Sequence, residues 1–248
     1  MKNIFLLLVT LCLTACKTEK KPADYVNPII GATTFDEFKG SYHGLGKTFP
    51  GVCTPFGLVQ LSPDTKTGGD NGSGYSWHHK TIEGFSFTHM SGVGWYGDLG
   101  NFLVMPTTGT LKTFKGTEEE PESGYRSRYS HEREQASAHK YTVMLDDYQI
   151  QAELAAAPRS GIIRFTYPKS DTSRIQIDLA RRIGGSSTEQ YVEVVDNHTI
   201  KGWMKCTPNT GGWGDGQGKA DYTVYFHCCF DKPLKNFGVW SADIPDEA

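Results

Sequence analysis

The 248-residue sequence has little net charge and lacks the short signatures of common hydrolytic centres. Its 25 Lys and Arg residues nearly balance 28 Asp and Glu residues, which gives a formal net charge of −3. This balance gives no reason to expect nucleic acid or an acidic polymer as a partner. No HExxH or GxSxG motif and no Ser-His-Asp order is present, so no catalytic residue is predicted in this chain.

The cysteines lack the spacing of a metal site. No CxxC motif or paired histidine spacing accompanies them, so no metal ligand is predicted. Two of the six cysteines fall in the N-terminal leader. An exported chain would allow three disulfide pairings among the other four. Buried free thiols are the favoured interpretation, and the pairing stays open. The four are Cys53, Cys206, Cys228 and Cys229.

Helical patterns are also scarce. The only helix-like stretch, SHEREQASAH (130–139), has no apolar stripe and is interpreted as a polar crossing or hairpin. No alternation of strands and helices appears, which argues against a parallel sheet. Many short segments instead alternate with period two between turn residues. The sequence therefore predicts an all-β fold, a large antiparallel two-sheet β-sandwich. The expected strands lie in 148–156, 161–167, 174–180, 191–195, 199–206 and 221–230.

Within these strands, the alternation assigns side chains to faces. Residues 148, 150, 152 and 154 share one face of their strand, as do residues 222, 224, 226 and 228 of the last one. In RIQIDLA, the pattern places Ile175, Ile177 and Leu179 on one face. Gln176 and Asp178 lie on the other face.

The first residues form a leader rather than part of the fold. Lys2 precedes an apolar run that is too short to span a bilayer, and the run ends in LTAC. This ending resembles a bacterial lipobox, with residues 1–16 as the signal peptide and Cys16 as the lipidated residue. Residues 17–23 are predicted to be a tether, and residues 24–248 the folded domain. The prediction is an exported bacterial lipoprotein, in the periplasm or at the outer-membrane surface, held to the membrane by its lipid anchor. The alternative is an ordinary signal peptide cut near Ala15.

One segment, GFSFTHMSGVGWYGDLGNFLVMPTTG (84–109), has neither a helical nor a strand period. Its glycines weaken any strand and let the backbone approach a ligand closely. Trp95 beside His89 and Asp98 is a usual arrangement for binding a pyranose ring. The alternative is a packed loop whose aromatic side chains fill its own interior. Trp77 in SGYSWHH offers a second aromatic ring for such a surface.

The order of several segments carries a family resemblance. These are DYVNPIIGA (24–32), GLGKTFPGVCTPFGLVQLSPDT (44–65), GYSWHHKTIEGFSFTHMSGVG (74–94), GDLGNFLVMPTTG (97–109) and the stretch 130–168. In this order they closely resemble the N-terminal domain of glycoside hydrolase family 92, the calcium-dependent exo-α-mannosidases. The resemblance covers almost the whole chain after the leader.

The resemblance implies a β-sandwich that packs on a C-terminal α/α barrel not included in this chain. The barrel would supply the catalytic carboxylates and most ligands of the Ca²⁺ expected in the full-length enzyme, so no cofactor is assigned to this chain. The site-facing positions carried over from the family, as contacts to a mannose-containing glycan, are Trp77, His89, Ser91, Trp95 and Asp98. The sequence departs from the family in the bulky pair Trp95–Tyr96, in Asn101 and in the turn at 137–140.

The resulting functional prediction is the carbohydrate-contacting N-terminal domain of an inverting exo-α-mannosidase that acts on N-glycans or mannans. It would be inactive without its barrel and would expose a large apolar face where the barrel docks. One alternative is a glycan-binding surface lipoprotein that functions alone. A further alternative is an independent enzyme with His89 and Asp98 as acid and base.

Overall fold

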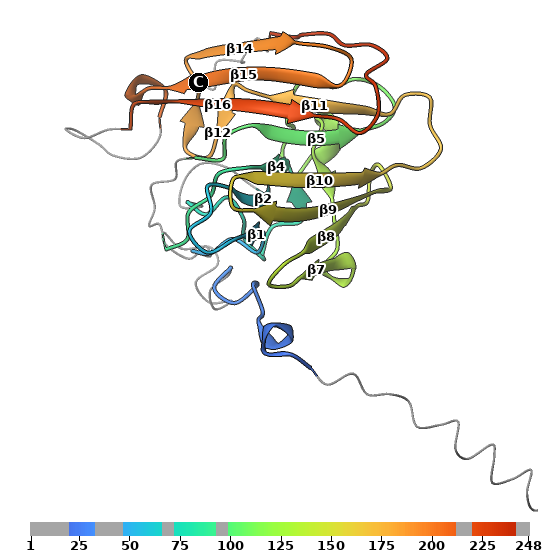
Figure 1. Cartoon of the computed structure of the whole chain (residues 1–248). Helices are drawn as coiled ribbons and strands as arrows, with labels where there is room; N and C mark the ends of the chain where they lie inside the picture. Colours follow the sequence, from blue (N-terminus) through green and yellow to red (C-terminus); the bar gives the residue numbers. More distant parts are fainter. Residues whose placement is uncertain (1–19, 33–46, 66–71, 93–98, 212–219, 242–248) are drawn as a thin grey trace, which may run out of the picture.

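The fold is built from short antiparallel strands (Figure 1). The computed structural model describes residues 20–32, 47–65, 72–92, 99–211 and 220–241. Within these ranges the helical elements are short 3-10 turns, so the all-β prediction is confirmed. No helix in the described ranges is long and apolar enough to cross a membrane. The turns are η2 (Pro22–Tyr25), η4 (Pro121–Ser123), η5 (His131–Arg133) and η6 (Pro208–Thr210).

Three sheets carry most of the strands. A five-stranded sheet has the order β1 (Val52–Cys53), β2 (Gln60–Asp64), β4 (Gly84–Ser86), β5 (Leu103–Thr107) and β11 (Arg174–Asp178). A four-stranded sheet has the order β10 (Ser160–Thr166), β9 (Ile150–Ala157), β8 (Tyr141–Leu145) and β7 (Glu134–Ala136). A three-stranded sheet contains β14 (Glu189–Val194), β15 (Thr199–Cys206) and β16 (Tyr222–Cys229). Two small ribbons pair β3 (Thr81–Ile82) with β6 (Ser127–Arg128), and β12 (Arg181–Arg182) with β13 (Gly185–Ser186).

The hydrophobic core lies between the five-stranded and four-stranded sheets. Leu61, Phe85 and Met105 from the first sheet belong to the same buried cluster as Val143 and Leu154 from the second. A smaller cluster, centred on Phe102, Met204 and Cys206, holds the inner face of the three-stranded sheet. Phe87, just after β4, packs against both clusters and so connects them. This packing of sheet faces confirms the predicted sandwich architecture.

All six expected strand segments form strands, and the predicted alternation holds in most of them. In β9, Ile150, Ala152 and Leu154 are buried together as expected. In β16, the residues at even positions face the core cluster and those at odd positions are exposed. The buried face of each strand is thus set by its period-two pattern.

The face assignment fails to predict burial in β11. Gln176 is 4% exposed, whereas Ile175 is 38% exposed, so the amide side chain faces inward. The amide is accommodated because its oxygen accepts a hydrogen bond from Thr107 and its nitrogen donates to the Lys112 carbonyl, each at 2.8 Å. Burying a polar side chain costs little free energy when its donor and acceptor both have partners. The polarity of Gln176 alone therefore did not reveal that it is buried.

The polar stretch 130–139 forms a hairpin, one of the two structures expected for it. It begins with η5, whose N-cap Ser130 accepts a hydrogen bond from the backbone of Glu132, and continues as β7. Strand β7 pairs with β8 through a turn in which Ser137 N–H donates to the Lys140 carbonyl. The turn at 137–140, where the sequence departs from the family, therefore connects two strands directly.

Gly202 in β15 tests how tightly the three-stranded sheet is packed. A Cβ atom at this position would lie 2.1 Å from the Tyr191 carbonyl oxygen and 2.7 Å from the Phe226 ring. We expect Gly202→Ala to lower the free energy of unfolding by about 1–3 kcal/mol, because backbone must move to relieve the overlap. Urea unfolding monitored by tryptophan fluorescence measures the change. Gly238→Ala is the matched control, since a Cβ there meets nothing within 4 Å; equal effects of the two substitutions would refute the packing argument.

Candidate functional site

A buried charge cluster lies beneath the segment that follows β4. The Asp64 side chain, at the end of β2, is completely buried. Its Oδ1 atom lies 2.9 Å from Nε2 of His89, and its Oδ2 atom lies 3.0 Å from a guanidinium nitrogen of Arg181. The Ser86 hydroxyl donates to the same carboxylate. Strands β2, β4 and β12 are therefore joined at one carboxylate.

A second acid extends this cluster. Glu83 is 1% exposed and forms ion pairs with Arg126 and, at 3.3 Å, with Arg181. Arg126 also donates to the Thr81 hydroxyl at 3.2 Å. Two buried acids are thus balanced by two buried guanidinium groups, which is the condition for charges to remain in a protein interior.

The electrostatics of the cluster stabilise its charged forms. Burial alone would raise the pKa of Asp64, but the charges of Arg181 and His89 and two hydrogen bonds outweigh it, so the pKa lies below its ordinary value. Burial would lower the pKa of Arg181, but the charges of Asp64 and Glu83 raise it overall. His89 Nδ1 lies 2.8 Å from the Gln60 carbonyl oxygen, so both ring nitrogens face acceptors.

The backbone directly after residues 93–98 is strained. Leu99 and Phe102 have φ angles of +72° and +60°, which side-chain-bearing residues rarely adopt. Asn101, between them, is buried and exchanges hydrogen bonds with Thr88 at 2.7 and 2.9 Å. The Phe87 N–H donates to the Asn101 carbonyl at 3.1 Å, and the Gly100 N–H donates to the Thr88 carbonyl at 2.7 Å. Such strain persists only where the surroundings enforce it, and it often occurs at functional sites.

Trp77 belongs to a second cluster, centred on Glu134. The Trp77 ring stacks on His131, with a centroid distance of 3.5 Å and an interplanar angle of 6°. His131 Nδ1 lies 2.6 Å from a Glu134 carboxyl oxygen, and Nε2 lies 2.8 Å from the Trp77 carbonyl oxygen. Both ring nitrogens of His131 therefore face oxygen atoms, and these contacts orient the ring flat against the indole.

Two tyrosines complete the environment of Glu134. Tyr75 donates to its carboxyl group at 2.9 Å, and Tyr141 donates at 2.6 Å. Burial, reinforced by the Glu134 charge, raises the pKa of Tyr141 well above its ordinary value, so this hydroxyl remains a donor. The carboxyl group is thereby held in one position, and it holds His131 against Trp77.

Backbone hydrogen bonds bring the predicted site segments together. The Trp77 N–H donates to the Ala32 carbonyl at 3.1 Å, and the Gly92 N–H donates to the Lys47 carbonyl at 2.6 Å. Lys47 N–H in turn donates to the Gly31 carbonyl at 2.9 Å. The SWHH, THMSG and TFPG motifs therefore converge on residues 31–32 and 47–48, although they are well separated in the sequence.

The structure places three of the five predicted glycan contacts. Trp77 is half-buried at its stack with His131, and Ser91 is exposed next to Gly92. His89 is buried, with its ring also 5.3 Å from that of Phe49, so it supports the site from below. Trp95 and Asp98 lie outside the described residues, as does Cys16. The roles of all of them in glycan binding stay predictions.

Sequence reasoning missed the groups that hold the site in place. Asp64, Arg181 and Glu134 come from segments far from the THMSG motif, and Asp64 and Arg181 have no local signature. The pairing of Glu134 with His131, three residues apart on one edge hairpin, was the one signal available in the sequence.

The described residues do not fit a metal site. No group of three or more His, Cys, Asp or Glu side chains in the described ranges could hold an ion. The buried acids are committed to other partners: Asp64 to Arg181, Glu83 to Arg126, and Glu134 to tyrosine hydroxyls. The expectation that Ca²⁺ binds in the full-length enzyme stays a prediction.

Comparisons with known proteins identify related domains. Residues 25–248 match the glycosyl hydrolase family 92 N-terminal domain. The structure of the family GH92 alpha-mannosidase BT3965 from Bacteroides thetaiotaomicron matches with a TM-score of 0.77 and 41% identity, over 88% of this chain and 27% of that chain. The gh92 family glycosyl hydrolase ccman5 matches with a TM-score of 0.63 and 28% identity, over 83% of this chain and 26% of that chain. This chain thus spans about a quarter of the length of these enzymes. No curated protein matches it.

The buried charge cluster predicts how stability responds to substitution and pH. Asp64→Asn removes one of the two carboxylates that pair with the buried Arg181, so we expect a loss of about 3 kcal/mol of unfolding free energy at neutral pH. The pKa of Asp64 is lower in the folded chain than its ordinary 3.8. The ionised carboxylate therefore stabilises the fold above that value, and this contribution is lost as the pH falls through the folded pKa.

Urea unfolding of both proteins at several pH values measures this difference. The gap between wild type and Asp64→Asn should be largest near neutral pH and should narrow below about pH 4. Asp147→Asn is the control, because it removes a more exposed ion pair with Arg128 and should destabilise the fold much less than Asp64→Asn. A gap that does not change with pH would show that Asp64 acts through packing alone.

Proposed function

Because the chain belongs to the glycosyl hydrolase family 92 N-terminal domain family, we propose that it is the carbohydrate-contacting part of an inverting exo-α-mannosidase. The observation that carries the proposal is the set of backbone hydrogen bonds that brings the segments of Trp77 and Ser91 to residues 31–32 and 47–48. The buried Asp64 cluster holds His89 of the same segment as Ser91, and its Arg181 donates to the Gly100 carbonyl in the strained segment 99–102 at 3.3 Å. Two matched proteins are named as a family GH92 alpha-mannosidase and a glycosyl hydrolase. Their chemistry suggests that the ligand is a mannose-containing glycan.

In this proposal the chain binds and orients the glycan, and another domain cleaves it. The ring of Trp77 would stack on the apolar face of a pyranose, while His131 covers the opposite face of the indole. Glycosidic hydrolysis by inversion needs two carboxyl groups about 6.5–9.5 Å apart. The buried acids described above are engaged by cations and tyrosines, so the catalytic pair is assigned to a domain that corresponds to the rest of the relatives' length.

An exposed turn offers a contact for such a domain. Phe56, between β1 and β2, is fully exposed and has a φ angle of +59°, and Leu58 nearby is 71% exposed. A large apolar side chain held in strained backbone and in water gains nothing within this chain. Burial against a catalytic domain would give it a role.

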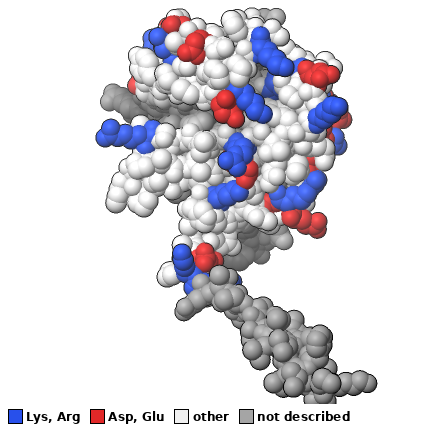
Figure 2. All heavy atoms as spheres, turned by 45° about the vertical axis from the view of Figure 1, so that its right-hand side comes forward, with Lys and Arg blue, Asp and Glu red and all other residues white. Residues whose placement is uncertain are grey.

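Acidic and basic side chains intermingle on the face of the molecule seen in Figure 2, so neither sign of charge dominates there. This mixed surface is compatible with a neutral glycan as ligand.

We also propose that Cys16 carries a lipid anchor, on the basis of the LTAC sequence before it. In this arrangement the chain is an exported bacterial lipoprotein.

Substitution of Trp77 tests glycan contact. We expect Trp77→Ala to weaken binding of α-mannobiose by about tenfold, because about 1.4 kcal/mol of ring stacking is lost. Isothermal titration calorimetry of the chain measures the affinity, and a reducing-sugar assay should detect no release of mannose. Trp77→Phe keeps a ring and is the matched control. Unchanged affinity of Trp77→Ala would exclude Trp77 as a contact, and no binding by the wild-type chain would contradict the proposed function.

Substitution of Cys16 tests the anchor. Expressed in a bacterium fed radiolabelled palmitate, the wild-type chain should incorporate label and sediment with membranes. Cys16→Ala should abolish both, whereas Cys12→Ala, in the apolar run, should leave both unchanged. Label that persists in Cys16→Ala would contradict the lipobox assignment.

A further inference from the structure

The outer face of the three-stranded sheet carries an aromatic row. In β14–β16, the even-numbered residues of β15 and β16 face the inner cluster with Met204 and Phe226, so the odd-numbered residues face outward. The strand register places Tyr191 directly opposite Trp203, and Trp203 directly opposite Tyr225. One aromatic side chain from each strand thus lies in a single line across the sheet.

The rings of this aromatic row are accessible. Tyr225 is 73% exposed and Tyr191 is 46% exposed, and Trp203 lies half-buried between them. The rings of Tyr191 and Trp203 are nearly parallel, with an interplanar angle of 17° and a centroid distance of 6.1 Å. Because neighbouring strands lie about 4.8 Å apart, the row extends about 10 Å between the outer backbones.

Paired charges border the aromatic row on both sides. Lys205 lies 3.0 Å from Glu189 in the row on one side, and Lys201 lies 3.3 Å from Glu193 in the row on the other. The Tyr191 hydroxyl donates to Glu193 at 3.2 Å. All four charged side chains are between 40% and 56% exposed. Each row is separated from the next by two residues along the strand, or about 7 Å.

We propose that this aromatic row is a second glycan-binding surface, whose ligand is a neutral oligosaccharide. The C–H faces of pyranose rings would stack on the aromatic side chains, and ring hydroxyls would reach the acceptors and donors of the bordering pairs. The equal number of acidic and basic groups favours no charged polymer. The proposal goes beyond the function above, which concerns the segments around Trp77.

The bordering charges argue against a close-packed protein partner. Covering them with an apolar surface would remove four ionised groups from water, and the cores of protein interfaces are depleted in such groups. A hydrated sugar can leave them solvated and still use the rings between them. Aromatic neighbours across strands also stabilise a sheet by themselves, so stability and binding must be measured separately.

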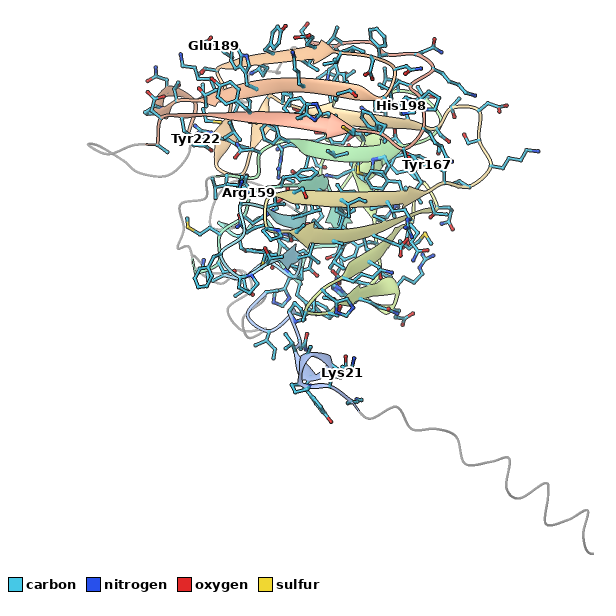
Figure 3. All side chains as sticks on the ribbon, in the orientation of Figure 1. Lys21, Arg159, Tyr167, Glu189, His198 and Tyr222 are labelled. Atoms are coloured by element: carbon cyan, nitrogen blue, oxygen red, sulfur yellow. The ribbon has the colours of Figure 1, made fainter. Side chains whose placement is uncertain are left out.

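The location of the aromatic row suits an accessory role. Glu189 of β14 lies at the opposite end of the molecule from Lys21, which belongs to the predicted tether (Figure 3). The three-stranded sheet that carries the row therefore lies far from the end at which the chain would be anchored. A long glycan could be held there independently of the site near Trp77.

Affinity electrophoresis tests the aromatic row. The purified chain is run in native gels that contain soluble α-mannan, soluble β-glucan or polygalacturonate. We expect retardation in a neutral glycan, and Tyr225→Leu should weaken it three- to tenfold, since one stacking ring is lost. Thr223→Ala, on the same strand and face, is the control without a ring and should behave as wild type. Urea unfolding of each variant checks that the sheet remains folded.

The outcomes separate this proposal from the function proposed above. Retardation that is weakened by Tyr225→Leu but not by Thr223→Ala supports the row as a binding surface. Retardation that Trp77→Ala abolishes and Tyr225→Leu leaves unchanged supports the first site and overturns the second. No retardation in either neutral glycan, or retardation in polygalacturonate alone, overturns it as well. A Trp203→Leu variant gives an independent reading should Tyr225→Leu prove unstable.

Discussion

The pairing of Asp64 with Arg181 and His89 is the constraint on which the candidate site depends. A carboxylate removed from water must find opposite charges and donors, or the fold loses several kcal/mol. Here the partners come from positions 86, 89 and 181, so satisfying one group brings the end of β2, the segment after β4 and the ribbon of β12 to one point. The exposed residues that follow His89 are therefore attached to a rigid segment, because a shift of His89 would expose the Asp64 carboxylate.

Features of the fold and the candidate site that depend on contacts between residues close in the sequence could be predicted. Features that depend on contacts between distant segments could not. The strands of β9 and β16 were predictable because burial on one face imposes a period of two. In β11 the alternation separates the faces but does not identify the buried one, because Gln176 is buried through hydrogen bonds to Thr107 and Lys112 that only the tertiary structure provides. His89 stood out in the sequence beside small residues and aromatics, yet its role is set by Asp64, 25 residues earlier. Pairing over such separations leaves no periodic trace in the sequence.

The Glu134 cluster shows a second way to place an aromatic side chain. Trp77 is positioned by a chain of contacts in which tyrosine hydroxyls hold a carboxyl group, and the carboxyl group holds His131. Each link restricts rotamers that would otherwise have to be frozen when a ligand binds. A preorganised ring of this kind supports recognition at a defined subsite. Of the polar residues in the edge hairpin, His131 and Glu134 belong to this network, whereas Glu132, Arg133 and Gln135 are exposed.

The outer aromatic row relies on a different physical basis. Its rings are ordered by strand register alone, with neighbours two residues away along each strand and one strand across. Strand register fixes the spacing of the rings but leaves their exposed faces in water. A sugar that binds there would displace weakly bound water and would not need to break hydrogen bonds within the protein. Such a surface gains from several weak contacts along a repeating ligand, whereas the Trp77 site gains from one ring held rigidly. The two proposals therefore assign different tasks to the two surfaces: the flat row would retain a long glycan, and the rigidly held Trp77 ring would position its terminal residue.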